Sequence, residues 1–500
     1  MSNSRNQALK VFRKTNPLLA VAVGIALSLI LMCIGDHEIW LDEAHHFLLA
    51  KNATSVSDLI SAMKYEGHPP LWNVVIKLLQ IETVGQLQVL SGLIMLVAAL
   101  VIVLFAPFSS ITRIAWVCSY FFLFEYAFIA RNYGLSVLFI LSAVVIYTYN
   151  NRALIPVALL LGLASLTHVY AGVLSFVLMV FFIWEASRHS VHRVSLIIPV
   201  ILFTLLLAIG IYCSRPQTDH FVFEYHSAEV HSLRRLGSMF LIPFKAFFHV
   251  PQFTSTQWWN SNLLLPDWKP AAVMVGTLGW LFPFFYLFGG KRKYVILFAI
   301  MLFALVVAIG LTPMPISLRH CGFVIVAFLV CMWLSRADSQ SRIESGKWNT
   351  IRNVALNLFF VVQIGAAGIA IYRERNTTFS HAKSVADYII QKGISANQLC
   401  VYPQYAGPAV AAYIGAPIFY AERNTYGTFA SWMLNEFYID EETMWERCLQ
   451  QQKNMNRPMF IATAVPLSLE HEKFELFELI RFSGAAVQAE NYVVYEIKPK

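Results

Sequence analysis

A short segment near the N-terminus gathers side chains that could carry acid–base chemistry. After Asp42 and Glu43 come one alanine and then two histidines, and Glu66 and His68 lie further along the same stretch. A carboxylate held beside a hydroxyl group can take its proton, and this general-base help typically accelerates a reaction by about 10² to 10⁴-fold. Because most acidic loop residues are simply solvated, the pair alone does not define a function.

Further polar residues stand at the ends of long apolar segments. Ionisable residues in or beside such segments are costly and tend to mark functional cavities. An arginine there can bind a phosphate through two parallel hydrogen bonds, and the alternative is that it reaches toward lipid headgroups. The residues concerned are Glu125, Arg131, Tyr133, His168, Tyr170, Arg319 and His320.

Signals for a cofactor are few. The sequence holds no Gly-rich nucleotide loop or P-loop, so a nucleotide is not the expected ligand. A divalent metal is a candidate cofactor, but the spacing matches no recognised closed site and its ligands stay unassigned. The candidate ligands are Asp42, His45, His46, Glu66 and His68. The cysteines show no CxxC spacing; Cys400 and Cys448 could pair in an oxidising compartment or be two buried free thiols.

The composition of the chain indicates that a membrane protein positions these residues. The chain has 500 residues, 57% of them hydrophobic and 13% charged, whereas soluble domains carry about 25% charged residues. A membrane-spanning helix needs about 20 mostly apolar residues, and about eleven segments qualify. They lie at residues 17–35, 87–106, 114–130, 134–149, 153–168, 170–186, 194–213, 271–289, 294–312, 316–334 and 350–372. We therefore predict a polytopic α-helical membrane domain over residues 1–372.

The basic residues predict its orientation. The net charge is +8, but the bases are grouped in short loops between spans, which indicates membrane topology and not nucleic-acid binding. With the N-terminus in the cytoplasm, each inside loop carries positive charge, including the cluster Lys291 to Lys293. The first outside loop, residues 36–86, is rich in acids. An odd number of spans then places the tail, residues 373–500, on the extracytoplasmic side.

Two water-facing regions accompany the spans. In the tail, apolar strand-like segments at 399–402, 418–420, 459–462 and 492–497 alternate with helical patterns near 381–392, 407–414, 430–451 and 468–480. This alternation predicts a small α/β domain. The outside loop 214–270 is rich in aromatic residues and histidine; it either anchors at the headgroup level or covers a cavity for a lipid substrate.

The motifs together resemble a known family. The order Trp40-Leu41-Asp42-Glu43, then Gly67-His68-Pro69-Pro70-Leu71, Arg131-Asn132-Tyr133, and Thr167-His168-Val169-Tyr170 is similar to that of the GT-C membrane glycosyltransferases. Within that fold it looks closest to the branch holding the protein O-mannosyltransferases and the lipid A aminoarabinose transferase. The similarity in layout covers roughly residues 17–335, and the tail corresponds only in its placement.

The resemblance implies a glycosyltransferase that takes a sugar from a polyprenyl-phosphate donor. Asp42 matches the family's catalytic acid, and Glu43 supports it. Arg131 and Arg319 are candidates for binding the donor phosphate, with Glu66, His68, Tyr133, His168 and Tyr170 as further active-site candidates. The implied location is the cytoplasmic (inner) membrane. An O-antigen or other glycan, a lipid such as the lipid A of lipopolysaccharide, and a protein all remain open as acceptors.

Two other classes of protein compete with this interpretation. A transporter or lipid flippase usually carries charged residues near the bilayer midplane, often with inverted repeats. Here the centres of the spans are almost free of charge, and polarity is concentrated at one surface. A noncatalytic membrane sensor that uses the tail is the other alternative.

Overall fold

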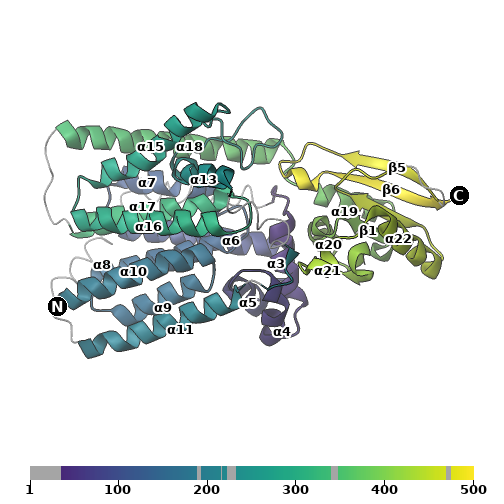
Figure 1. Cartoon of the computed structure of the whole chain (residues 1–500), viewed down its shortest axis with the longest axis horizontal. Helices are drawn as coiled ribbons and strands as arrows, with labels where there is room; N and C mark the ends of the chain where they lie inside the picture. The colour runs from purple at the N-terminus through teal and green to yellow at the C-terminus, as the bar shows by residue number, and fades with distance from the viewer. Residues whose placement is uncertain (1–34, 189–192, 216, 222–231, 339–346, 469–473) are drawn as a thin grey trace.

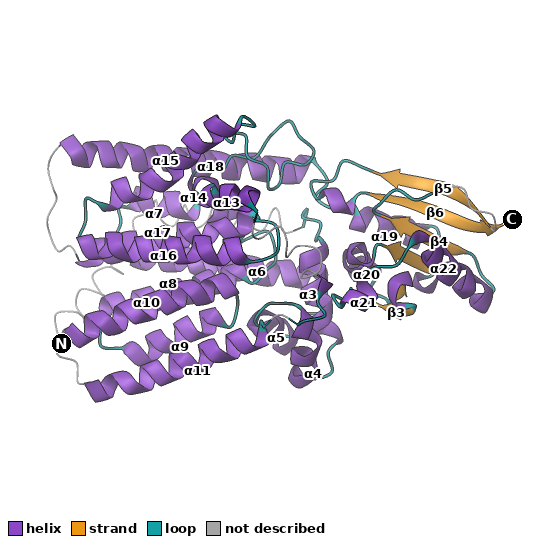
Figure 2. Ribbon diagram, in the orientation of Figure 1, coloured by secondary structure: helices purple, strands orange, loops and turns teal. Residues whose placement is uncertain are grey.

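The structure is a computed structural model that describes residues 35–188, 193–215, 217–221, 232–338, 347–468 and 474–500. Figure 1 shows a bundle of long helices with an α/β domain at one of its ends, and Figure 2 shows that the strands belong to that domain. This confirms the predicted fold class of a mostly helical membrane protein with a C-terminal α/β domain. The expected first span, 17–35, lies almost entirely outside the described residues.

Seven described helices are long and apolar enough to cross a membrane. Their lengths suit an apolar layer about 30 Å thick, because an α-helix rises 1.5 Å per residue. Two shorter apolar helices, α8 (Tyr133–Tyr149) and α9 (Leu154–Ser165), pack beside them. The long ones are α6 (Val84–Phe105), α10 (Val169–Arg188), η3 with α11 (Arg193–Cys213), α15 (Lys269–Leu287), α16 (Arg292–Leu311), α17 (Leu318–Asp338) and α18 (Lys347–Asn376).

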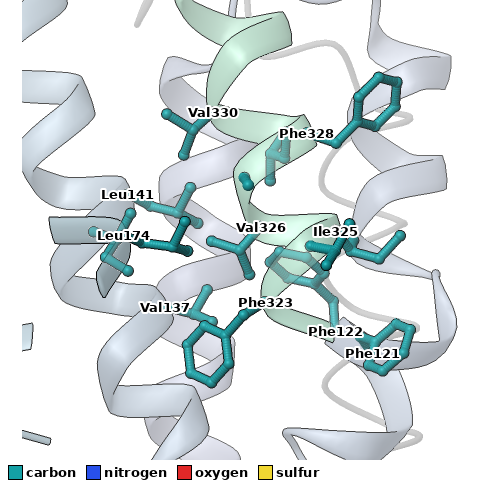
Figure 3. Packing of buried hydrophobic residues seen from close by; sticks show 14 of the residues in the cluster. Phe121, Phe122, Val137, Leu141, Leu174, Phe323, Ile325, Val326, Phe328 and Val330 are labelled. Atoms are coloured by element: carbon teal, nitrogen blue, oxygen red, sulfur yellow. The ribbon is translucent and has the colours of Figure 1, made fainter. Parts of the chain in front are cut away.

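Helix α17 forms the centre of the bundle. Nearly all its side chains are buried, and it packs against α8, α10, α16 and the short helix α14 (Ile242–Phe247). Figure 3 shows Phe323, Val326 and Phe328 of α17 among side chains of neighbouring helices. Because α17 begins at Leu318, this packing fixes where Arg319 stands at the end of the bundle.

The predicted span 114–130 is wrong as a single helix. The segment forms α7 (Ser110–Val117), a π-helical turn η2 (Phe121–Glu125) and then irregular backbone up to α8. Many of its aromatic side chains are buried against α17 and α18. Apolar composition alone cannot distinguish such a broken, protein-covered segment from a spanning helix.

Short helices occupy the end of the bundle nearest the α/β domain (Figure 1). The segment predicted as the first outside loop forms α3 (Leu41–Asn52), α4 (Val56–Ala62), η1 (Met63–Tyr65) and α5 (Leu71–Leu78). Part of the loop predicted at 214–270 is helical, and its helices α13 (Leu233–Phe240) and α14 pack against α15, α16 and α17. Helices α14 and α15 approach each other closely, because Gly279 of α15 has no side chain and lies against the backbone of Phe244 in α14.

The C-terminal domain contains a mixed six-stranded sheet in the order β3-β2-β1-β4-β6-β5. Strand β1 pairs in parallel with β2 and β4, and the other neighbours are antiparallel. The strands are β1 (Leu399–Tyr402), β2 (Ile418–Tyr420), β3 (Thr425–Gly427), β4 (Met459–Thr463), β5 (Phe474–Phe482) and β6 (Tyr492–Pro499). The helices are α19 (Ala382–Gln391), η4 (Ala396–Gln398), η5 (Gln404–Ala406), α20 (Gly407–Ile414), η6 (Ala421–Arg423), α21 (Leu434–Phe437), α22 (Glu441–Met455) and η7 (Gln488–Glu490).

The two cysteines of this domain, Cys400 and Cys448, are buried free thiols.

The helix predicted near 468–480 is wrong, because residues 474–482 form strand β5. The sequence there is rich in Glu and Leu, which favour helices in isolation. The segment instead pairs antiparallel along β6, from Phe474 opposite Pro499 to Phe482 opposite Tyr492. Long-range pairing with an otherwise open sheet edge therefore outweighs local propensity.

Candidate functional site

Asp42 lies between two arginines from distant parts of the chain. Its Oδ2 is 2.8 Å from Arg319 Nη2 and 3.5 Å from Arg131 Nη1. Arg131 Nη1 also donates to the backbone carbonyl of Asp42 at 2.6 Å. The first turn of α3, the irregular segment just before α8 and the first turn of α17 thus meet at one point. The structure brings together three residues predicted from the sequence.

The electrostatics keep Asp42 ionised. Burial by itself raises the pKa of this carboxyl group, but the charges of Arg319 and then Arg131 outweigh it, so that its pKa lies below the usual value. The Asp42 side chain is 23% exposed, whereas those of Arg319 and Arg131 are 14% and 3% exposed. The carboxylate is therefore the more accessible partner, and at neutral pH it is ready to accept a proton or a hydrogen bond.

Arg319 is held on an aromatic and acidic support. Its guanidinium carbon lies 4.9 Å from the centre of the Trp40 ring and 5.8 Å from that of Trp259. Trp259 Nε1 donates to Glu125 at 3.2 Å, and Tyr120 donates to the same carboxylate at 2.8 Å. Such cation–π contacts are stronger where water is excluded, so they favour one position of the guanidinium.

Glu43 points away from Asp42. Its Oε2 is 3.0 Å from His37 Nε2, and Glu374 Oε1 at the end of α18 lies 2.8 Å from the other ring nitrogen, His37 Nδ1. Burial lowers the pKa of His37, but the two carboxylates raise it by more, so its pKa lies well above the usual value. Glu43 Oε1 accepts a hydrogen bond from the Ala130 N–H at 2.6 Å. Glu43 therefore holds the backbone around the site through the Ala130 N–H.

A row of buried and half-buried imidazoles extends from the site. The His46 and His68 rings are 5.6 Å apart, as are those of His68 and His168, and His168 is 6.0 Å from His320. Burial, followed by the charge of Arg131, lowers the pKa of His46 and of His68. Both histidines are therefore neutral near pH 7 and can donate or accept hydrogen bonds without adding charge.

Glu66, Tyr133 and Tyr170 have different surroundings. Glu66 Oε1 lies 2.8 Å from His45 Nε2, and the Glu66 backbone carbonyl accepts from His68 Nδ1 at 2.6 Å. The Tyr133 ring packs 4.9 Å from the His168 ring, so Tyr133 lines the site. The Tyr170 hydroxyl is instead 2.9 Å from Thr312 Oγ1, at the end of α16.

Several buried donors around Asp42 lack a partner within the described structure. They include the Nε atoms of Arg131 and Arg319, the Trp40 indole nitrogen and His168 Nε2. A buried N–H without a partner costs about 1 to 3 kcal/mol, so a cluster of them indicates a polar ligand. An anion such as a phosphate matches the two guanidinium groups best.

The described residues do not gather as a metal site: no three His, Cys, Asp or Glu side chains among them have a suitable geometry. The candidate ligands have other contacts, such as His46 Nδ1 with Asn73 at 3.1 Å.

Sequence reasoning missed Trp259 and Glu490 as parts of the site. Trp259 is one of many aromatic residues in the loop 214–270, and only the fold brings it into contact with Arg319. Glu490 of the C-terminal domain accepts a hydrogen bond from the Leu41 N–H at 2.6 Å. A lone glutamate in a turn gives no sequence signal for such a contact.

The site and the basic loops lie at opposite ends of the bundle. Lys293 Nζ is 2.6 Å from Glu185 Oε2 and 3.0 Å from Asp338 Oδ2. These ion pairs connect the end of α10, the start of α16 and the end of α17. Helix α17 is 21 residues long, with Arg319 in its first turn and Asp338 at its last position. Asp42 pairs with Arg319, so the site lies at the first end of α17. Figure 1 shows that helix α3 and the α/β domain are at this end.

These features define a multi-pass membrane protein with a charged site at one membrane surface, covered in part by an α/β domain. No family model and no curated protein matches the chain. Two solved structures of ArnT from Cupriavidus metallidurans are similar to it. The one bound to undecaprenyl phosphate has a TM-score of 0.49 and 12% identity, covering 97% of this chain and 98% of that one. The apo structure has a TM-score of 0.46 and 12% identity, covering 95% and 97%. This similarity concerns the overall fold alone and carries no chemistry from one protein to the other.

Proposed function

We propose that the chain is a membrane glycosyltransferase that moves a sugar from a polyprenyl-phosphate-sugar donor to a hydroxyl group of a glycan, lipid or protein. The observation that supports this most is the placement of Asp42 between Arg131 and Arg319 at one end of the bundle. A base and two phosphate-binding groups at a membrane surface are what such a transfer needs, because the donor's lipid tail stays in the bilayer.

In the proposed reaction, Asp42 accepts the proton of the acceptor hydroxyl as its oxygen attacks the anomeric carbon. The bond between that carbon and the phosphate oxygen breaks, and the polyprenyl phosphate leaves with the electron pair. Arg131 and Arg319 compensate the charge that develops on the phosphate, a stabilisation that is strongest in a site shielded from water. The sugar ends on the acceptor oxygen, and the proton on Asp42 passes to solvent.

The ion pair suggests how donor binding prepares the base. Without a ligand, Arg319 Nη2 is 2.8 Å from Asp42, which lowers the pKa of the carboxyl group and makes it a weak base. A donor phosphate would compete for the same guanidinium, whose Nε is already without a partner. As Arg319 turns toward the phosphate, Asp42 becomes more basic at the moment when the acceptor must lose its proton.

A transfer assay tests the proposal. Membranes containing the chain would receive synthetic polyprenyl-phosphate sugars with a radiolabelled sugar, together with glycan, lipid and peptide acceptors. We expect labelled product with wild type and with Asp58→Asn, a control acid that is exposed in the same outside loop. Asp42→Asn should give little product. No transfer from any polyprenyl-phosphate sugar, or equal transfer by Asp42→Asn and Asp58→Asn, would overturn the proposal.

A further inference from the structure

The C-terminal domain reaches the helix that carries Asp42. Glu490 Oε1 accepts the Leu41 N–H at 2.6 Å, and Leu41 is the first residue of α3. The first four N–H groups of a helix have no partner within the helix, so Glu490 satisfies one of them from another domain.

Glu490 is itself firmly held. It is 1% exposed, and its other carboxylate oxygen accepts a hydrogen bond from the Ser380 hydroxyl. Its backbone carbonyl accepts from the His381 N–H at 3.2 Å, just before α19 begins. The carboxylate is therefore fixed relative to the C-terminal domain, and any force it exerts on α3 is transmitted from that domain.

Other contacts join the same two parts of the chain. The Ile39 N–H donates to the Tyr413 hydroxyl of α20 at 2.8 Å, and the Phe379 N–H donates to Glu38 at 2.9 Å. Further along α3, Trp432 Nε1 lies 3.1 Å from His45 Nε2. The C-terminal domain thus contacts the segment before α3, its first turn and its second turn.

We propose that Glu490 is a positioning residue of the site and that the C-terminal domain holds Asp42 in register between Arg131 and Arg319. The proposal rests on the proposed transferase function for its kinetic consequence, but the contact can be tested without it. Glu490 touches α3 one residue before Asp42, so a change in the cap moves the carboxylate directly. A displacement of about 1 Å can cost up to about 10²-fold in rate.

Two variants and one control separate positioning from folding. Glu490→Ala removes the acceptor, whereas Glu490→Gln keeps an oxygen that can accept the Leu41 N–H. Glutamine is a close substitute because burial raises the pKa of Glu490 to about 8, so that the neutral acid is populated at neutral pH. Glu422→Ala is the matched control: Glu422 is also buried, and it accepts the Gln404 N–H at 2.6 Å within the same domain.

The first readout needs no substrate. Hydrogen exchange of the full-length protein in detergent, followed by mass spectrometry, should be faster at the first turn of α3 in Glu490→Ala. It should be near wild type there in Glu490→Gln and Glu422→Ala. Unchanged exchange at α3 in Glu490→Ala would overturn the proposal, whether or not the chain is a transferase.

The second readout is transfer from a polyprenyl-phosphate sugar. We expect Glu490→Ala to lower kcat by roughly 10- to 100-fold with little change in the donor KM, and Glu490→Gln to restore most of the loss. Combined with Asp42→Asn, Glu490→Ala should add no further loss, because it acts through Asp42. Equal losses in Glu490→Ala and Glu422→Ala, or additive losses in the double variant, would show a structural role only. A wild type without transfer but with the exchange result intact would refute the proposed function and leave the cap in place.

Discussion

The Ala130 N–H donates a hydrogen bond to Glu43 Oε1 at 2.6 Å. Glu43 directly follows Asp42 and Ala130 directly precedes Arg131, so this single bond ties together the two backbones that carry the 3.5 Å Asp42–Arg131 pair. The two adjacent acids therefore differ in role: one faces the arginines and the other fixes the backbone. This division leads to the first prediction.

Asp42→Asn should reduce sugar transfer by about 10²-fold or more, because asparagine keeps the shape but cannot accept the proton. Glu43→Gln should be milder in turnover, since glutamine still offers an oxygen to the Ala130 N–H. It should nevertheless lower thermal stability, because a hydrogen-bonded pair with buried His37 is weakened. Initial rates and melting temperatures of purified protein check both. If Asp42→Asn were active and Glu43→Gln inactive, the two roles would have to be exchanged.

Arg131→Ala and Arg319→Ala should both weaken use of the donor, and lysine should restore it only partly because the planar guanidinium fork is lost. Arg131→Ala is expected to be the more severe, since Arg131 also donates to the Asp42 carbonyl at 2.6 Å and so shapes the backbone. The measurement is donor KM and kcat with a polyprenyl-phosphate sugar. An alanine variant with wild-type donor affinity and turnover would assign that arginine to headgroup contact.

The pH dependence of kcat/KM, which reports the donor-free protein in which Arg319 still pairs with Asp42, should follow the depressed pKa of Asp42. Because the arginines lower that pKa, the carboxylate is present above its shifted value and activity is lost only as the pH falls through it. Arg319→Gln removes the larger of the two lowering charges, so the acid limb of the residual activity should move to higher pH. An acid limb at the same pH in Arg319→Gln and wild type would show that Asp42 is not the titrating base.

The positions of Asp42, Arg131 and Arg319 at one level could be predicted, because each stands at the end of an apolar segment and a bilayer aligns such ends. The four sheet strands at 399–402, 418–420, 459–462 and 492–497 were likewise readable from short apolar runs between turns. Local patterns suffice where burial is periodic and the element is short.

Other features depend on contacts between distant segments. The chain at 114–130 is apolar enough for a span, but it breaks at η2 because the protein, and not lipid, surrounds it. Strand β5 exists because β6 offers an edge to pair with. The cap from Glu490 to Leu41 joins residues far apart in sequence, and no local signal announces it.

Gly322→Ala should destabilise the protein and impair transfer. A Cβ at Gly322 would meet the Tyr126 hydroxyl and the Phe121 ring, and that hydroxyl donates to the Arg319 carbonyl at 2.8 Å. Overpacking of this kind typically costs about 1 to 3 kcal/mol. Gly365→Ala on α18 is the matched control, because nothing lies within 4 Å of its added Cβ. A lower melting temperature in detergent for the first variant only is the expected result; equal melting temperatures would contradict the close packing at η2.

The basic loops predict the sidedness of the site. The inside-positive rule predicts that the cluster at Lys291–Lys293 is cytoplasmic, and the structure puts this cluster at the end of the bundle opposite to Asp42. We expect Asp58→Cys and Lys392→Cys, both exposed positions, to react with a membrane-impermeant maleimide on intact cells. Arg292→Cys should react only after permeabilisation. Each cysteine would be introduced into a chain whose native cysteines are replaced. Labelling of Arg292→Cys on intact cells, with protection of the other two, would place Asp42 in the cytoplasm and rule out transfer on the outer face, because the base must lie on the same side as its acceptor.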